Sequence, residues 1–170
     1  PDLPLKTPIG KSGRREKGSR VFGIDAVNEF DDLTDDIYDY CEILKIGVDT
    51  LIHESGPSQI EINLNHGDPL QLADQAFMFK RAVRQVALKH GIHATFMSKP
   101  YQGHPGSSMH IHQNIISKKT NKNLFSDENG NNTEEFFHFI GGLQTYLPDA
   151  MLFFAPYVNS YRRFVIDASA

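Results

Sequence analysis

The sequence predicts an α+β fold in which an antiparallel sheet carries helices on one face. Segments with the two-residue period of strands and segments with the 3.6-residue period of helices both occur, but they do not alternate strictly along the chain. A hydrophobic content of 39% and a charged content of 22% are typical of a globular protein. Because 170 residues suffice for one hydrophobic core, we expect residues 1–170 to form a single domain.

Composition and charge exclude several classes of partner. The net charge is −4 and no long basic stripe occurs, so we expect no nucleic-acid partner. No apolar run approaches the roughly 20 residues that span a bilayer, and no signal-peptide pattern is present, so we expect no membrane partner. Cys41 is the only cysteine, which excludes an intrachain disulfide and fits the cytoplasm. The chain opens on Pro1 and stops after a loop-like stretch, so we expect it to be part of a longer protein.

The N-terminal part of the chain contains an arm, a strand and a helix. Residues 1–20 are rich in Pro, Gly and charged side chains and have no period, so we expect a loop or arm. A short strand is predicted over residues 21–27. The 3-and-4 spacing of apolar residues predicts a helix over residues 31–46, which begins at two aspartates and ends at Gly47.

Two strands separated by a Gly-Pro turn are predicted next, over residues 50–53 and 59–65. The second strand alternates between an apolar face and a polar face. The apolar face consists of Ile60, Ile62 and Leu64, and the polar face of Gln59, Glu61 and Asn63. A polar face that carries a carboxylate is either solvated or part of a site.

The remaining elements are predicted from periodicity and caps. Pro69 begins the longest helix, which Gly91 ends. The other predicted segments are strands over residues 94–97 and 109–115, a polar loop or β-excursion over 117–132, a helix over 134–146 capped by Thr133, a short helix over 148–154 and a loop over 155–170.

Three side chains are candidate ligands for a divalent cation. Mg²⁺ and Mn²⁺ prefer carboxylate oxygen, and Mn²⁺ also accepts imidazole, so Glu54, Glu61 and His110 are candidates. A cation would relieve the repulsion between two unpaired carboxylates in one pocket. The alternative is an exposed Glu54 and a Glu61 paired with Arg or Lys. His110 and His112 form an H-x-H pair, which in a strand places both imidazoles on one face, but strand histidines also serve only structural hydrogen bonds.

Basic side chains are candidates for binding anions. Arg162 and Arg163 follow an Asn-Ser-Tyr turn, and a guanidinium fork suits a carboxylate or a phosphate. The alternative is an exposed pair of arginines. Lys99 precedes the glycine-containing loop that leads to His110, and it lies either near phosphate or in solvent.

Three ordered motifs together resemble the glutamine synthetase family. They are His-Glu…Gly-x-x-Gln-x-Glu over residues 53–61, Lys-Pro…Gly-Ser-x-Met-His-x-His over 99–112, and Ala-Pro-x-x-Asn-Ser-Tyr-x-Arg over 155–163. The resemblance covers residues 25–163. The segments Asp36-Ile-Tyr-Asp-Tyr-Cys and His66-Gly-Asp-Pro-Leu are most similar to the branch of γ-glutamyl-amide synthetases that includes γ-glutamylputrescine synthetase.

The resemblance implies an ATP-dependent ligase that joins the side-chain carboxylate of glutamate to ammonia or an amine through γ-glutamyl phosphate. It implies two divalent cations, Mg²⁺ or Mn²⁺, in each complete site. It also implies that the curved sheet is part of the catalytic barrel of this family, that residues 155–170 are a substrate or flap loop, and that the full-length protein is a ring-shaped homo-oligomer.

Residue roles are carried over from the resemblance position by position. Glu54 and Glu61 resemble two ligands of the first metal, and His110 resembles the imidazole ligand of the second. His112 resembles the histidine near the ATP phosphates, and Asp49 corresponds to an acidic residue near the ribose. Gly106 resembles the loop glycine that meets the substrate amino acid, and Arg163, as the catalytic-site arginine, resembles the one that holds the glutamate carboxylate.

Several departures from the family pattern matter. The upstream Glu-x-Glu strand, the downstream Arg-Glu-x-Arg region and the small N-terminal domain have no counterpart in the chain, so we expect these residues alone to be inactive. Ser169 stands where ammonia-using members carry a flap glutamate, which makes a larger amine the more plausible acceptor. Pro105 and Ser108 stand where the family often has asparagine and usually has glycine.

Two other functions compete with the ligase. A cupin-like metal-binding barrel also has a glycine before H-x-H, but it requires a glutamate about four residues after the second histidine, where this chain has Ile116. The other alternative is a non-catalytic fragment that binds metal or nucleotide.

Overall fold

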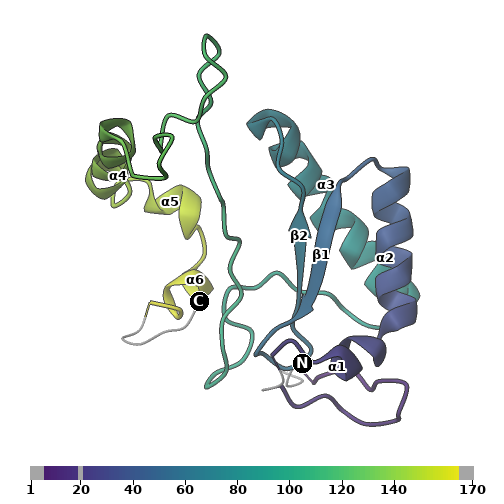
Figure 1. Cartoon of the computed structure of the whole chain (residues 1–170). Coiled ribbons are helices and arrows are strands. Elements are labelled where there is room, and N and C mark those ends of the chain that lie inside the picture. Colours follow the sequence, from purple (N-terminus) through teal and green to yellow (C-terminus); the bar gives the residue numbers. More distant parts are fainter. Residues whose placement is uncertain (1–5, 19–20, 165–170) are drawn as a thin grey trace. The chain divides into compact units, whose positions relative to one another are not determined.

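The computed structural model describes residues 6–18 and 21–164 (Figure 1). Within them the chain forms two compact units: the first runs up to Ser107 and the second begins at Ser108. The two units are distinguished by contacts inside the chain. They do not test whether residues 1–170 form one domain, which stays a prediction.

The first unit is an antiparallel hairpin with two helices on one face. Strands β1 (Val48–His53) and β2 (Ile60–Leu64) pair with each other, and helices α2 (Asp31–Ile43) and α3 (Pro69–Lys89) pack beside them (Figure 1). The core consists of Ile37, Cys41, Ile46 and Val86, with Leu33, Val48, Ile62, Leu64, Phe79 and Val83 packed against it. Ile62 and Leu64, two of the three residues on the predicted apolar face of β2, pack against this core. The predicted α+β class is confirmed.

Local sequence explains where α3 begins and ends. The Asp68 carboxylate accepts hydrogen bonds from the amides of Leu70 and Gln71, and Pro69 occupies the first turn, where its missing N–H costs nothing. Gly91 follows the helix with φ of 70°, a conformation that glycine adopts without strain. Helix α3 thus matches its prediction closely.

Helix α2 begins as predicted but ends before residue 46. Lys45 adopts a left-handed φ of 57°, and the amide of Ile46 donates to the carbonyl of Cys41 at 2.8 Å, so the helix closes before Gly47 is reached. At Gly47 the chain passes so close to Asn65 that a Cβ atom added to Gly47 would lie 2.8 Å from Asn65 Nδ2. Glycine permits this close approach.

Three strand predictions are wrong. Residues 24–28 form helix α1 (Ile24–Asn28) in place of a strand, and the amide of the preceding Phe22 donates to the carbonyl of His53. Residues 94–97 and 109–115 are irregular, because neither segment has a strand partner among the described residues. A strand exists only through pairing, which a single segment does not encode.

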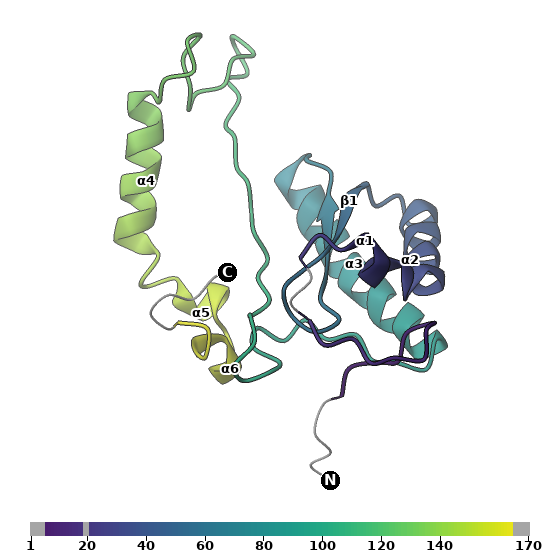
Figure 2. The ribbon, with the colours of Figure 1, turned by 60° about the horizontal axis from the view of Figure 1, so that its bottom comes forward.

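The second unit is helical apart from an extended entry and a loop. Helix α4 (Glu134–Tyr146) has the predicted bounds, and Thr133 caps it by accepting a hydrogen bond from the amide of Phe136 at 3.3 Å (Figure 2). Residues 117–132 form a loop with one isolated bridge inside it, between Ser126 and Asn132.

Short helices complete the second unit. Helix α5 (Met151–Phe154) starts later than predicted, and helix α6 (Val158–Tyr161) lies inside the segment predicted as a loop. Neither α4 nor α5 contains a buried residue, and several of their aromatic side chains are exposed, such as Phe137, Phe153 and Phe154.

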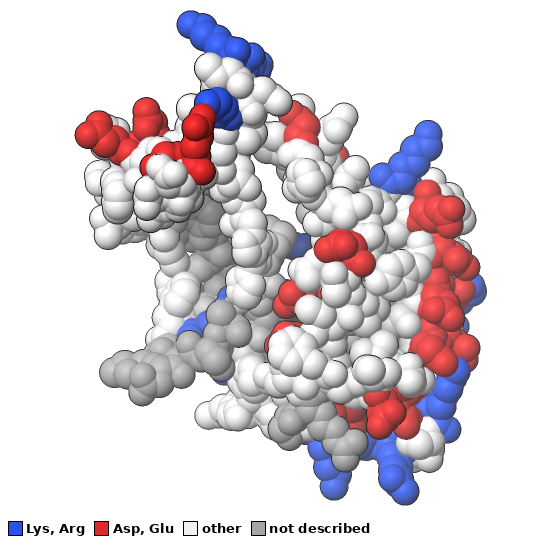
Figure 3. All heavy atoms as spheres, viewed as in Figure 1, with Lys and Arg blue, Asp and Glu red and all other residues white. Residues whose placement is uncertain are grey.

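The surface of α2 is acidic. Asp and Glu atoms gather over this helix in Figure 3. The acidic residues of α2 are Asp31, Asp32, Asp35, Asp36, Asp39 and Glu42.

Within the described ranges, no helix combines the length and the apolar character that crossing a bilayer requires.

Candidate functional site

Glu54 and Glu61 lie on the same face of the hairpin. Strand pairing sets Ile52 opposite Glu61, and the amide of Glu54 continues the ladder by donating to the carbonyl of Gln59 at 2.9 Å. Glu54 is the first residue after β1, and continuing the strand alternation by one residue assigns it to the face of Ile52 and Glu61. This is the face opposite Ile62 and Leu64, which pack toward the helices.

Both carboxylates are half-buried. Neither forms an ion pair within the described residues, so the alternative of a Glu61 paired with Arg or Lys is not seen there. Among the described residues, the one hydrogen bond to either carboxylate is long, 3.3 Å from the Ser55 amide to Glu54 Oε2. Two unpaired carboxylates on one face are donors that fit a hard divalent cation. No group of three or more potential ligands occurs in the described residues.

The acidic turn, defined as residues 54–59, begins at Glu54 and ends two residues before Glu61. It contacts a second loop. The glycine loop, residues 99–107, is closed at its base by the Ser107 amide, which donates to the Ser98 carbonyl at 2.8 Å. Gly106 in this loop is buried, and its carbonyl accepts a hydrogen bond from Gln59 Nε2 at 2.9 Å. The first and second motifs are therefore in direct contact through Gln59.

The Glu16 carboxylate forms hydrogen bonds to both the N-terminal arm and the acidic turn. The sequence did not indicate this role. Its Oε1 atom accepts from the Gly18 amide at 2.7 Å, and its Oε2 atom accepts from the Ser58 amide. The same carboxylate lies 3.8 Å from Nε2 of His53, a buried ring with no hydrogen-bond partner in the described part of the chain. Because Glu16 lies in a basic, Gly-rich run that is typical of a solvated loop, no local signal identifies it.

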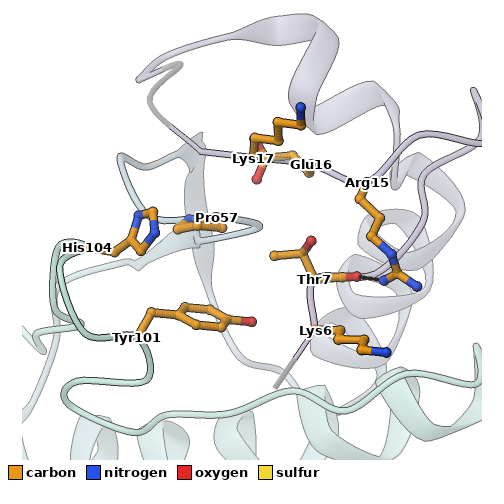
Figure 4. Close-up of a pocket in the computed structure, with 8 residues that line it drawn as sticks. All are labelled: Lys6, Thr7, Arg15, Glu16, Lys17, Pro57, Tyr101 and His104. Atoms are coloured by element: carbon orange, nitrogen blue, oxygen red, sulfur yellow. Dashed lines mark hydrogen bonds between the residues drawn. The ribbon is translucent and has the colours of Figure 1, made fainter. Parts of the chain in front are cut away.

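A hollow of about 500 Å³ lies between the arm, the acidic turn and the glycine loop (Figure 4). Its lining consists of Lys6, Thr7, Arg15, Glu16, Lys17, Pro57, Tyr101 and His104. The ammonium groups of Lys6 and Lys17 are turned away from the space between Pro57 and Tyr101, and the Arg15 guanidinium donates to the Thr7 carbonyl. The charged groups therefore do not converge on one point.

The second unit carries the remaining predicted site residues except Asp49. His110 and His112 are exposed on an irregular segment, so the strand geometry expected for the H-x-H pair is absent. Arg163 is half-buried, and its Nη2 atom donates a hydrogen bond to Ser108 Oγ. Arg162 is exposed. In the first unit, Asp49 is exposed on β1 beside an irregularity in the strand pairing.

The predicted residues thus fall into two sets. The first unit holds the two glutamates and Gly106, and the second unit holds the two histidines and Arg163. The gathering of Glu54, Glu61 and His110 around one cavity stays a prediction. Ser169 lies outside the described residues.

These features define the structural class as an α+β fold in which the acidic turn contacts the glycine loop. A sequence profile of the glutamine synthetase catalytic domain matches residues 2–170. The chain belongs to the glutamine synthetase family, as its three motifs predict.

Individual relatives agree with this assignment. The chain is 42% identical over 153 residues to γ-glutamylputrescine synthetase PuuA of Escherichia coli, covering 88% of this chain and 32% of that protein. It is 38% identical over 144 residues to a glutamine synthetase of Pyrococcus horikoshii, covering 85% and 32%. The predicted γ-glutamyl-amide synthetase branch is thus represented among its relatives, which are named as synthetases.

Solved structures agree with the family. The structure of GmaS without ligand matches with a TM-score of 0.77 and 30% identity, covering 95% of this chain and 36% of that one. A GmaS complex with ADP matches with the same TM-score, 29% identity and coverage of 98% and 36%. The chain spans about a third of the length of these relatives.

Proposed function

We propose that the protein carrying this chain is an ATP-dependent ligase that joins the side-chain carboxylate of glutamate to an amine or ammonia. The glutamate carboxylate attacks the γ-phosphate of ATP, which releases ADP and forms γ-glutamyl phosphate. The amine then attacks the acyl carbon and displaces phosphate, and the nitrogen loses a proton. We also propose that the full-length protein is a ring-shaped homo-oligomer in the cytoplasm and that the hairpin is part of a barrel sheet.

We propose metal and nucleotide roles for five of the predicted residues. Glu54 and Glu61 hold one divalent cation and His110 contributes to a second. Bound cations stabilise negative charge on the transferring phosphoryl group. His112 lies near the ATP phosphates, and Asp49 near the ribose.

Glutamate is held by the residues of the second and third motifs. The Gly106 backbone meets the amino acid, and the Arg163 guanidinium forms a two-point contact with a carboxylate, which a planar fork suits better than an ammonium group. Two residues of the glycine loop, Lys99 and His104, close it by a hydrogen bond of 2.6 Å from Nζ to the carbonyl.

The observation that carries this proposal is a pair of half-buried carboxylates at the hairpin, without ion-pair partners in the described part of a chain that belongs to the glutamine synthetase family. Two carboxylates on one face repel each other, and a divalent cation bound between them would relieve that repulsion. Family membership also argues against the cupin-like alternative.

Trapping of the acyl phosphate tests the proposal. Hydroxylamine attacks γ-glutamyl phosphate and yields a hydroxamate, so the full-length protein with glutamate, ATP and Mg²⁺ should form it. Glu54→Gln and Glu61→Gln should each lower the rate about 100-fold or more by removing a metal ligand. Glu42→Gln, on the exposed face of α2, is the matched control and should leave the rate within about twofold. Absence of hydroxamate from the unaltered protein would refute the proposal.

We propose that the acceptor is an amine larger than ammonia. Ser169 replaces a flap glutamate that would help deprotonate ammonium and shield the acyl phosphate. Steady-state rates of the full-length protein with ammonium and with diamines decide the matter, and a strong preference for ammonium would defeat this part of the proposal.

The 170-residue polypeptide alone should be inactive and bind metal weakly, because the upstream and downstream ligand motifs are not in it. Calorimetry with Mn²⁺ should show no tight site. Tight binding at two sites, or ligase activity of the isolated polypeptide, would show that these residues suffice. The non-catalytic alternative is favoured instead if the flanking coding sequence lacks both the Glu-x-Glu and the Arg-Glu-x-Arg motifs.

A further inference from the structure

We propose that Gln59 is a positioning residue that fixes the glycine loop against the acidic turn and thereby sets where glutamate is bound relative to the metal carboxylates. This inference rests on the proposed function, since it takes Gly106 as part of the glutamate site. The contact itself is observed independently of that function.

Both ends of the Gln59 side chain bind backbone groups. Its Oε1 atom accepts a hydrogen bond from the Gly56 amide at 2.9 Å, and its Nε2 atom donates to the Gly106 carbonyl at 2.9 Å. Both glycines are buried. Rotating the side chain away would leave a buried donor and a buried acceptor without partners, which is unfavourable for each group. The amide therefore has one preferred orientation.

The acidic turn is shaped around this amide. A Cβ atom at Gly56 would lie 2.4 Å from Gln59 Oε1, so a larger residue there would displace the Gln59 amide from its present orientation. The main chain of Gln59 also closes the turn, because its amide donates to the Gly56 carbonyl and its carbonyl accepts from Glu54. One residue thus sets both the turn and its contact with the neighbouring loop.

The glycine loop keeps its own shape without Gln59. Its base is closed by the Ser98–Ser107 and Lys99–His104 hydrogen bonds, neither of which involves the hairpin. The acidic turn is joined to the glycine loop by the hydrogen bond from Gln59 Nε2 to the Gly106 carbonyl. Loss of the Gln59 amide should therefore displace an intact loop relative to Glu54 and Glu61, and a displacement of about 1 Å can cost about 100-fold in rate.

Two substitutions separate the donor from the acceptor. Gln59→Glu keeps an oxygen for the Gly56 amide but places a carboxylate against the Gly106 carbonyl. Gln59→Met removes both hydrogen bonds without adding charge beside the metal carboxylates. Gln75→Glu is the matched control, because Gln75 Nε2 also donates to a backbone carbonyl, that of Lys45 at 3.4 Å, away from either loop.

Two measurements on the full-length protein test the inference. Amide hydrogen exchange over residues 99–107 should become about 10-fold faster or more in both Gln59 variants and stay unchanged in Gln75→Glu. The KM for glutamate should rise about 10-fold or more, whereas the KM for ATP should change less than about threefold. If Gln59→Glu does not fold, Gln59→Met carries both measurements; if Gln59→Met does not fold, Gln59→Leu, which is equally uncharged and lacks both hydrogen bonds, takes its place.

Each outcome is decisive. Unchanged exchange in the glycine loop, equal changes in the KM values for glutamate and ATP, or an effect confined to the charged Gln59→Glu variant would overturn the inference. An unaltered protein that makes no γ-glutamyl hydroxamate would instead refute the proposed function, and hydrogen exchange would still judge the Gln59 contact.

Discussion

The Nη2 atom of Arg163 donates a hydrogen bond to the hydroxyl of Ser108, which lies two residues after Gly106 in the sequence. Ser108 stands where the resemblance leads us to expect glycine, and its hydroxyl contacts the arginine proposed to hold glutamate. A hydroxyl acceptor restricts a long guanidinium side chain that otherwise samples many rotamers.

Replacing Arg163 by lysine should weaken glutamate binding. Lysine keeps the charge but loses the planar fork, so Arg163→Lys should raise the KM for glutamate about 10-fold or more in the full-length protein. The neighbouring exposed Arg162 provides the control, and Arg162→Lys should change the KM by less than about twofold. Equal effects of the two substitutions would show that Arg163 has no special role.

Gly18 should tolerate alanine poorly. Its φ is 81°, and an added Cβ would lie 3.0 Å from the Pro57 nitrogen and 3.1 Å from the Ser55 carbonyl oxygen. Gly18→Ala should therefore lower the free energy of unfolding by about 2–3 kcal/mol, through backbone strain and a clash with the acidic turn. Gly13→Ala has a similar φ of 75° but no atom within 4 Å, and it should cost only about 1 kcal/mol. Urea denaturation compares the two variants, and equal losses would contradict the clash.

Asp36 should make the stability of the first unit depend on pH. It joins α2 to α3, with Oδ2 2.9 Å from Lys89 Nζ and 2.8 Å from His90 Nε2, and hydrogen bonds from Lys89 and then His90 lower the pKa of this carboxyl from its ordinary value of 3.8. A depressed pKa in the folded state means that ionised Asp36 stabilises the fold above pH 3.8 and that this contribution is lost as the pH falls through the folded value.

Asp36→Asn should accordingly lower the urea midpoint at pH 7, and its difference from the unaltered protein should shrink as the medium is acidified below about pH 4. Asp35, exposed on the same helix and in none of the ion pairs found in the described residues, supplies the control variant Asp35→Asn. A pH-independent difference for Asp36→Asn would argue against the ion pair as its cause.

Cys41 should react slowly with thiol reagents. Its side chain is 1% exposed in the core between α2 and α3, and burial raises the pKa of its thiol. Because the thiolate is the reactive form, modification of the native protein by a disulfide reagent should be at least about 100-fold slower than in urea. Comparable rates in the two conditions would show that this core opens readily.

Sequence reasoning succeeded where the determinants are local. Proline and a capping aspartate define the start of α3, Thr133 defines that of α4, and alternation separates the two faces of β2. It failed over residues 94–97 and 109–115, because strand formation there requires a partner segment. The roles of Glu16 and Gln59 could not be predicted, because both depend on contacts between segments distant in sequence. Glu16 contacts Ser58 at a sequence separation of 42 residues, and Gln59 contacts Gly106 at a separation of 47.

The proposed ligase requires Glu54, Glu61 and His110 to meet around one cation-binding cavity. A crystal structure of the full-length protein grown with Mn²⁺, with the metal located by its anomalous scattering, tests it directly. We expect one Mn²⁺ ion bound by both Glu54 and Glu61 and a second bound by His110 in the same cavity. Manganese absent from these carboxylates, with the three side chains on separate surfaces, would contradict the proposed ligase.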